Sequence, residues 1–337
     1  MIDIIIPAYN ARKTLDRALA SIVMQQRDDL RVTIADDASD ESYEDITARY
    51  PIRINIVRSE VNGGPGAARQ YAIDRTDGKF MMFLDADDTL YGSDAVSVLM
   101  RHMQAGCVAV FGSFREELPR GAVKIHEADG TWMHGKLYRR SHWTENGIRF
   151  HPTSRSNEDN GVNSIVRLTA AKAGGYVTVI PDVVYAWQYS DGTITRKDDC
   201  IYYFDASYAG YVENKLYAFS EAERIMGRVT DEMALEAVSV MIYLYCYWLE
   251  TEDLHPELAE KNLAATAAYY REVYSRHRAR IPKEDFAAMY HVQIEEMYRR
   301  FPNIVHRHTI EQFLNVLAEV GGGEHGTEET KGQAVHV

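Results

Sequence analysis

The chain has 337 residues, with 50 acidic against 37 basic side chains and a formal net charge of −13. Apolar residues make up 46% of it and charged residues 26%, which is typical of a globular protein and excludes the collagen-like, disordered and disulfide-scaffold classes. Because a chain this acidic repels phosphate backbones, nucleic acid is not expected as a partner.

Cysteine use and the N-terminus indicate a reducing compartment. Cys107, Cys200 and Cys246 are far apart and form no CxxC pair, so neither a disulfide framework nor a zinc site is expected. No basic region or cleavage motif precedes the first apolar run, so no secretory signal is expected. The apolar stretch 237–249 is shorter than the ~20 residues of a membrane span and predicts a buried helix. We expect a cytoplasmic protein.

The first 115 residues alternate strand-length apolar runs with amphipathic segments. The predicted strands are Ile2–Ile6, Val32–Ala35, Ile54–Val57, Phe80–Leu84 and Cys107–Phe111. Helices are predicted from near Ala11 and after Pro65. This alternation predicts an α/β fold, a mostly parallel sheet with helices on both faces. In such sheets ligands bind beyond the carboxyl ends of the strands, so functional residues are expected directly after each run.

The rest of the chain changes character twice. Residues 116–197 are short polar pieces with possible strands near Val123 and at Val177–Tyr185. From about Tyr202 the segments are long and strand-poor, which predicts a helical C-terminal domain. Its predicted helices are Met233–Leu249, Glu257–His277, Lys283–Phe301 and Thr309–Val320, with a capping box at Thr309–Gln312. We expect a first domain at 1–200 (a nucleotide-binding half to about 115, then an acceptor half), the helical domain at 201–320 and a disordered tail at 321–337.

Three carboxylates, Asp85, Asp87 and Asp88, follow the fourth apolar run. They repel one another unless a cation lies among them. Hard oxygen ligands at this spacing suit Mg²⁺ or Mn²⁺, which usually also hold substrate phosphates. A solvated acidic turn in which Asp88 caps a helix is about equally compatible with the pattern.

Further polar motifs stand at the other predicted strand ends. In Ala35–Asp40 a carboxylate could accept hydrogen bonds from a ribose or base, or the segment could only cap a helix. In Pro7–Asn10 the ring of Tyr9 could stack a base, although an ordinary turn has the same composition. In Asn62–Arg69 the glycines allow close backbone approach, and Arg69 could orient a carboxylate or meet a phosphate. The chain lacks a P-loop ending and a GxGxxG after the first strand, which disfavours nucleotide hydrolysis and dinucleotide redox chemistry.

Taken in order, these motifs resemble those of family 2 glycosyltransferases with the GT-A fold. The resemblance covers about the first 200 residues. The segments that carry it are Pro7–Asn10, Asp36–Asp40, Asn62–Arg69, Gly78–Asp88, Lys136–Arg140, Asn146–Phe150 and Asn157–Asp159.

The resemblance implies an inverting transfer of a sugar from a nucleotide-diphosphate sugar, most often a UDP-sugar, with Mn²⁺ or Mg²⁺. Asp159 would be the general base. Asp87 would bind the metal ion on the diphosphate, and Asp85 would hold the metal ion through its water shell or contact the ribose. Asp37 would hold the uracil. The donor site would also include Pro7, Ala8, Tyr9, Asn10, Asn62, Gly64, Arg69 and Ala86, and the acceptor side Glu158, His151 and Lys136.

The sequence departs from the family pattern at one place and leaves alternatives open. Many relatives carry a histidine near the diphosphate after the strand that follows the Glu-Asp pair, but residues 185–196 contain none. Thr193, Thr195, Arg196 or Lys197 could cover the diphosphate instead. A nucleotidyltransferase that makes sugar nucleotides and a non-catalytic sugar-nucleotide-binding module are the alternative functions. The acceptor could be a polysaccharide, a lipid-linked saccharide, a teichoic-acid-like polymer or a protein. Self-association and a peripheral position at the membrane stay open.

Overall fold

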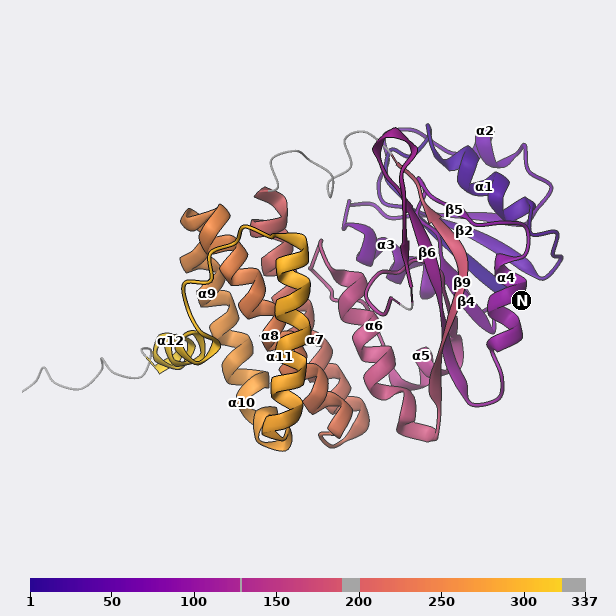
Figure 1. Cartoon of the computed structure of the whole chain (residues 1–337). Coiled ribbons are helices and arrows are strands. Elements are labelled where there is room, and N and C mark those ends of the chain that lie inside the picture. Colours follow the sequence, from indigo (N-terminus) through magenta and orange to yellow (C-terminus); the bar gives the residue numbers. More distant parts are fainter. Residues whose placement is uncertain (128, 190–200, 323–337) are drawn as a thin grey trace, which may run out of the picture. The chain divides into compact units, whose positions relative to one another are not determined.

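The structure is a computed structural model that describes residues 1–127, 129–189 and 201–322 (Figure 1). The chain divides into two compact units. Unit 1 comprises Met1–Tyr202 and Glu213–Arg228, and unit 2 comprises Tyr203–Val212 and Val229–Val337. The helix α7 (Tyr208–Met226) therefore begins in unit 2 and continues in unit 1.

Unit 1 is built on one sheet with the strand order β3-β2-β1-β4-β8-β6-β9-β5, and β7 pairs with β6. The strands β3 (Ile54–Arg58), β2 (Leu30–Asp36), β1 (Ile2–Ala8) and β4 (Phe80–Phe83) are parallel, as the alternation predicted. Their carboxyl ends meet along one side of the sheet, which we call the carboxyl edge.

Beyond β4 the sheet is mixed. The strand β8 (Lys136–Arg139) is antiparallel to β4 and to β6 (Cys107–Glu117), whereas β9 (Tyr176–Trp187) runs parallel to β6. Two short strands, β5 (Thr89–Leu90) and β7 (Val123–His126), complete it. Because β8 runs against β4, the residues that precede β8 lie at the carboxyl edge.

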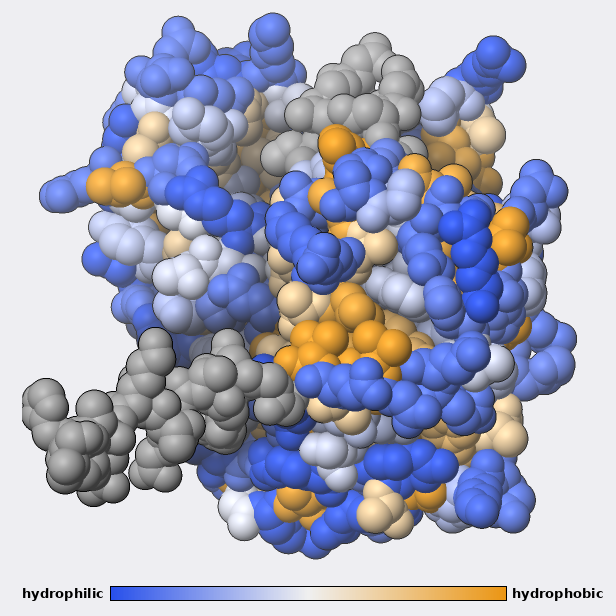
Figure 2. Space-filling model, turned by 90° about the vertical axis from the view of Figure 1, so that its left-hand side faces the viewer, coloured by the Kyte–Doolittle hydropathy of each residue, from blue (hydrophilic) through white to orange (hydrophobic). Residues whose placement is uncertain are grey.

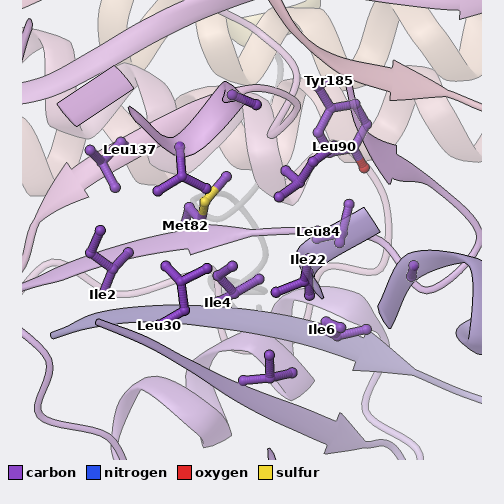
Figure 3. Close-up of a cluster of buried hydrophobic side chains, with 14 of the residues drawn as sticks. Ile2, Ile4, Ile6, Ile22, Leu30, Met82, Leu84, Leu90, Leu137 and Tyr185 are labelled. Carbon is purple, nitrogen blue, oxygen red and sulfur yellow. The ribbon is translucent and has the colours of Figure 1, made fainter. Parts of the chain in front are cut away.

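Helices cover both faces of the sheet. Along β1, Ile4 and Ile6 belong to one buried cluster and Ile5 to another, since successive side chains of a strand point to opposite faces. Figure 3 shows the first cluster, in which Ile4, Ile6, Met82 and Leu84 pack together. The first face is covered by α1 (Leu15–Val23) and α4 (Ala95–His102), and the second by α3 (Pro65–Ile73), α5 (Arg140–Asn146) and α6 (Glu158–Thr169). A short helix, α2 (Glu44–Thr47), follows β2.

The helices α5 and α6 lie in a region where the sequence predicted only short polar pieces. The sequence of α6, EDNGVNSIVRLT, contains asparagines and a glycine, which are weak helix formers. Burial overrides that propensity, because ten of its twelve residues are buried. A Cβ at Gly161 would come within 2.7 Å of Asn214 Oδ1, so a glycine lets α6 approach α7.

Unit 2 is helical, as predicted. It contains α8 (Asp231–Leu254), α9 (Pro256–Tyr269), α10 (Ser275–His277), α11 (Lys283–Arg300) and α12 (Ile310–Gly322). The capping box is present: the Thr309 amide donates to Gln312 Oε1 at 2.8 Å, and the Gln312 amide donates to Thr309 Oγ1 at 3.2 Å. The helix continues to Gly322, past the predicted start of the tail at 321, and residues 323–337 lie outside the described residues.

The helix α8 is longer than the apolar stretch that predicted it. Its 24 residues are long and apolar enough to cross a membrane, but 72% of its most apolar window is buried inside the protein. Tyr245, Tyr247 and Trp248 are buried there, as expected for core residues. On the face that Figure 2 draws, polar side chains dominate and the largest group of apolar ones forms a patch near the middle.

A buried carboxylate ties together the opposite end of the sheet. Asp3 Oδ1 accepts from Arg31 Nε at 2.7 Å, and Asp3 Oδ2 accepts from Arg140 Nη2 at 2.8 Å and from the Gly78 amide at 2.7 Å. We predict that Asp3→Ala lowers the free energy of unfolding by about 3–5 kcal/mol, because two arginines lose a buried partner. Asp77, which is 88% exposed and also contacts Arg31, is the matched control. In urea denaturation Asp77→Ala should change stability by less than about 0.5 kcal/mol, and equal effects of the two variants would refute the prediction.

Candidate active site

The loops after β1 and β2 are joined at the carboxyl edge. Asn10, which has a positive φ of 51°, donates from Nδ2 to Asp40 Oδ2 and accepts the Asp40 amide on Oδ1, each at 2.9 Å. The Asn10 amide donates to Ser39 Oγ at 3.0 Å. Ala8 is buried and Pro7 half-buried, whereas Tyr9 is 54% exposed. The two loops therefore form a rigid pair that presents one tyrosine ring to solvent.

The Asp37 carboxylate organises the glycine loop before α3. Its Oδ1 accepts the Gly63 amide at 2.8 Å, and its Oδ2 accepts the Gly64 amide at 2.7 Å. Asn62 Nδ2 donates to the Asp37 carbonyl at 3.2 Å. Gly64 has a φ of 87°, a backbone conformation that residues other than glycine rarely adopt. Asp37, Asn62 and Gly64, which the sequence assigned to the donor, thus lie together.

Arg69 joins two carboxylates that are far apart in the sequence. Its Nη2 donates to Asp85 Oδ1 at 2.6 Å and its Nη1 to Glu158 Oε1 at 2.7 Å. The Arg69 side chain is only 4% exposed. Burial alone would lower its pKa, but Asp85 and Glu158 outweigh that effect and raise it. A Cβ at Gly66 would come within 2.9 Å of Glu158 Cγ, so α3 and α6 approach closely where this bridge forms.

The Asp85 carboxylate lies between the Arg69 guanidinium and the His134 imidazole. Besides Arg69, His134 Nε2 lies 3.6 Å from Asp85 Oδ2 and 3.8 Å from Asp88 Oδ2. Burial would raise the pKa of the Asp85 carboxyl, but Arg69 and His134 hold it well below its ordinary value. Asp85 therefore stays ionised, and 29% of its side chain is exposed.

Asp88 is held more deeply than Asp85. Its Oδ2 accepts from Tyr185 Oη at 2.7 Å and its Oδ1 from the Gln188 amide at 2.8 Å, and the residue is 1% exposed. Burial, together with Asp85 and Asp87, raises the pKa of its carboxyl. Asp87 is half-buried, and its carbonyl accepts from Arg17 Nη2. Ala86 between them is buried.

One group of side chains in the described part of the chain could hold a metal ion. The ligand atoms of Asp85, Asp88 and His134 all lie within 4.8 Å of one another. Two carboxylates and an imidazole form a donor set that suits Mn²⁺ and tolerates Mg²⁺. The sequence assigned Asp85 to the ion but missed His134. The predicted substitutes Thr193, Thr195, Arg196 and Lys197 lie outside the described residues.

Asp159 opens α6 beside Glu158, which Arg69 binds. Asp159 Oδ1 accepts the Asn160 amide at 2.8 Å, and the residue is half-buried. Burial and the neighbouring Glu158 raise the pKa of its carboxyl to about 7, against the opposing effect of Arg69. Such a carboxyl exchanges a proton near neutral pH, which is what a general base requires.

Lys136 and His151 lie in different surroundings. Lys136 is fully buried; its Nζ donates to the His134 carbonyl at 3.3 Å and lies 4.9 Å from the centroid of the Phe111 ring. Burial lowers its pKa to about 8. His151 Nδ1 accepts the Ser154 amide at 3.0 Å, so His151 shapes the loop that leads into α6. Lys136 can therefore act on the site through its charge. His151 can act on it by shaping the loop before α6.

Comparison with known proteins identifies the fold family. Residues 3–156 match the family described as glycosyl transferase family 2. This match covers 154 of the chain's 337 residues, so the chain is similar to the family over nearly its first half. The matched region contains every donor motif and ends just before the Glu158–Asp159 pair.

Two curated proteins similar to this chain are named as glycosyltransferases. It is 25% identical over 202 residues to the poly(ribitol-phosphate) β-N-acetylglucosaminyltransferase TarS of Staphylococcus aureus, which covers 54% of this chain and 34% of TarS. It is 30% identical over 117 residues to the putative teichuronic acid biosynthesis glycosyltransferase TuaG of Bacillus subtilis, covering 34% of this chain and 46% of TuaG. This chain thus spans about a third to a half of these curated relatives.

The solved structures extend the likeness to both units. The structure of TarS residues 1–349 in complex with UDP-GlcNAc matches with a TM-score of 0.63 at 17% identity, over 94% of this chain and 90% of that one. The mannosyltransferase PcManGT of Pyrobaculum calidifontis, in complex with GDP-Man and Mn²⁺, matches with a TM-score of 0.51 at 16% identity, over 96% and 87%. The GT-A fold with helices after it, which the sequence resemblance implied, is confirmed.

The Arg69 bridge makes a prediction about stability. Arg69→Met leaves Asp85 and Glu158 without their buried counter-charge, so the free energy of unfolding in urea should fall by about 3–5 kcal/mol. Arg69→Lys should lower the free energy of unfolding by an intermediate amount, because the ammonium keeps the charge but lacks the planar fork whose two nitrogens reach separate carboxylates. Arg75→Met, at an exposed position two residues after the end of the same helix, serves as the control. If the Arg69 and Arg75 variants were equally stable, the bridge would not hold the site together.

Proposed function

We propose that this glycosyltransferase domain transfers a sugar from a nucleotide-diphosphate sugar to an acceptor hydroxyl, with inversion at the anomeric carbon. The observation that carries the proposal is the Arg69 bridge, which brings the aspartates after β4 and the start of α6 to one place. A donor held at β4 would thus lie beside the carboxyl of Asp159. The structure of TarS with UDP-GlcNAc supports a UDP-sugar as the donor.

The donor would lie along the carboxyl edge with its base at the β1–β2 end. The exposed ring of Tyr9 is available for stacking on a base. Each oxygen of Asp37 accepts one glycine amide, and a carboxylate oxygen can accept a further hydrogen bond, here from uracil N–H. Pro7, Ala8, Asn10, Asn62 and Gly64 would shape this end of the pocket.

A divalent ion, Mn²⁺ or Mg²⁺, would lie beside Asp85. When bound, such an ion supplies positive charge that stabilises the leaving nucleoside diphosphate. We assign Asp85 and Asp87 as its ligands, because both side chains are only partly buried. Asp88 is fully buried, and each of its oxygens already accepts a hydrogen bond. In this assignment His134, whose Nε2 lies 3.6 Å from Asp85 Oδ2, orients Asp85, and Asp88 is held by Tyr185 and the Gln188 amide.

Asp159 would take the proton of the acceptor hydroxyl as that oxygen attacks the anomeric carbon. A single displacement needs one base and no covalent enzyme nucleophile, and inversion follows from it. Glu158 is occupied by Arg69, so its part is to fix the start of α6. Because TarS is named for a poly(ribitol-phosphate) and TuaG for teichuronic acid biosynthesis, we place the acceptor in cell-surface glycan synthesis and the enzyme in the cytoplasm.

The assignment of Asp159 as the general base predicts how kcat/KM depends on pH, and it predicts that Asp159→Asn removes this dependence. A base must be deprotonated, so kcat/KM should rise with pH through about 7 and level off above it. Asp159→Asn should lower kcat by about 10²- to 10⁴-fold and remove that rise, while donor affinity changes little. Asp182→Asn, an exposed carboxylate on β9, is the control for fold and assay. Transfer by Asp159→Asn at the native rate would disprove the assignment.

The metal assignment separates two neighbouring aspartates. Asp87→Asn should weaken Mn²⁺-dependent UDP binding by at least about tenfold, measured by calorimetry and by the electron paramagnetic resonance of bound Mn²⁺. Asp88→Asn, the matched neighbour, should leave it within about threefold. The opposite result, with Asp88→Asn and His134→Gln abolishing Mn²⁺ binding and Asp87→Asn not, would place the ion in the Asp85–Asp88–His134 group.

A further inference from the structure

Two indole rings lie beside His134 and the acidic group formed by Asp85 and Asp88, and no step of the proposed reaction uses them. Trp132 precedes β8 and Trp187 ends β9, and their ring centroids are 5.1 Å apart with an interplanar angle of 39°. Both pack against the core of unit 1 but stay partly exposed. We call this pair of rings the tryptophan shelf.

The tryptophan shelf has a rigid support. The His134 ring stacks on Trp132 with centroids 5.7 Å apart and on Tyr185 at 4.5 Å, and Phe114 meets it edge-on at 4.8 Å. His134, Tyr185 and Phe114 are all buried. Because packing already fixes the rings, a ligand that stacks on them would lose little binding energy to ordering side chains.

Strand order places the tryptophan shelf on the side of β4 away from the proposed site of the nucleotide base. The strands β1, β2 and β3, with Asp37 and Tyr9, lie on one side of β4, whereas β8, β6 and β9 lie on the other. Since β8 is antiparallel to β4 and β9 is parallel to β6, the start of β8 and the end of β9 both lie at the carboxyl edge. Figure 1 shows β6 and β9 side by side in this half of the sheet.

Hydrogen bonds connect the tryptophan shelf to α6, and ring contacts connect it to His134 beside Asp85 and Asp88. Asn163, one turn after Asp159 on α6, donates from Nδ2 to the carbonyls of Thr131 at 2.9 Å and Trp132 at 3.0 Å. On the other side, His134 Nε2 faces the carboxylates of Asp85 and Asp88. The tryptophan shelf therefore keeps its position relative to Asp159, the proposed general base, and to Asp85 and Asp88.

We infer that the tryptophan shelf is an acceptor subsite that stacks a pyranose ring, so that the acceptor is a saccharide at its receiving end. A pyranose has a flat apolar C–H face bordered by hydroxyl groups, and it matches an indole surface next to carboxylate acceptors. An acyclic polyol phosphate or a lipid tail lacks such a rigid face. This inference rests on the proposed transferase function, because it names the acceptor of that same site.

Ligand-observed NMR on the full chain with UDP and Mn²⁺ tests the inference directly. The probes are the methyl β-pyranosides of glucose, galactose and N-acetylglucosamine, with ribitol as the acyclic control. We expect saturation transfer to the ring protons of at least one pyranoside and none to ribitol. Trp132→Ala and Trp187→Ala should lose the signal, and the corresponding Phe variants should retain part of it.

The control is Trp248→Phe in unit 2, which should leave the signal unchanged. A cooperative thermal transition and unchanged far-ultraviolet circular dichroism would show that the alanine variants are folded. No saturation transfer from any pyranoside in the native chain, equal transfer to ribitol, or full signal in both alanine variants would overturn the inference.

Donor hydrolysis separates this inference from the proposed function. The donor is the UDP- or GDP-sugar that stabilises the protein most with Mn²⁺, and its slow hydrolysis needs no acceptor. The alanine variants should hydrolyse it with unchanged KM. A KM raised in proportion to the lost NMR signal would mean that the shelf stacks the donor sugar, which overturns the inference. Absent hydrolysis and transfer with the NMR signal intact would refute the transferase function but leave the shelf as a saccharide site.

Discussion

The site depends on the two hydrogen bonds that the Arg69 guanidinium donates to Asp85 and Glu158. The guanidinium is buried between Asp85, which follows β4, and Glu158, which opens α6, so two segments 73 residues apart share one counter-charge. Burying charged groups such as Arg69 and Glu158 is costly unless each finds a partner with good geometry, and here both hydrogen bonds of Arg69 are shorter than 2.8 Å. Because each carboxylate depends on the same cation, the acidic group and the neighbour of Asp159 keep a fixed relation.

The sheet of unit 1 has a parallel half (β3, β2, β1 and β4) and a mixed half (β8, β6, β9 and β5), and in the account we propose each half binds a different substrate. The parallel half presents the loops of Asn10, Asp37 and Gly64, which are held together by backbone amides and suit a nucleotide. The mixed half brings the reversed strand β8 to the same edge, and with it His134, Trp132 and, from β9, Trp187. The carboxylates of Asp85 and Asp87 lie between these halves. In the account we propose, the donor lies on one side of β4, the acceptor on the other, and the sugar passes between them.

The parallel strands and the helices α1, α3, α8, α11 and α12 were predictable because local patterns specify them. Short apolar runs such as Ile2–Ala8 are buried on both faces, and Thr309 and Gln312 mark a helix start by their own hydrogen bonds. The helix α6 was not predictable, because its asparagines and glycine disfavour a helix and only packing against α3, α7 and the sheet stabilises it. His134 was missed for a similar reason. Its place beside Asp85 follows from the reversal of β8, which no pattern near His134 indicates.

The central claim is that carboxylates after β4 hold a metal ion on the donor diphosphate. The most direct measurement is the anomalous scattering of Mn²⁺ in crystals of the full chain grown with UDP and MnCl₂. The account predicts one strong peak at the carboxyl edge that contacts Asp85 and the diphosphate, with the uracil on the side of Asp37. A bound UDP without Mn²⁺ beside Asp85, or a UDP–Mn²⁺ complex away from this edge, would contradict it.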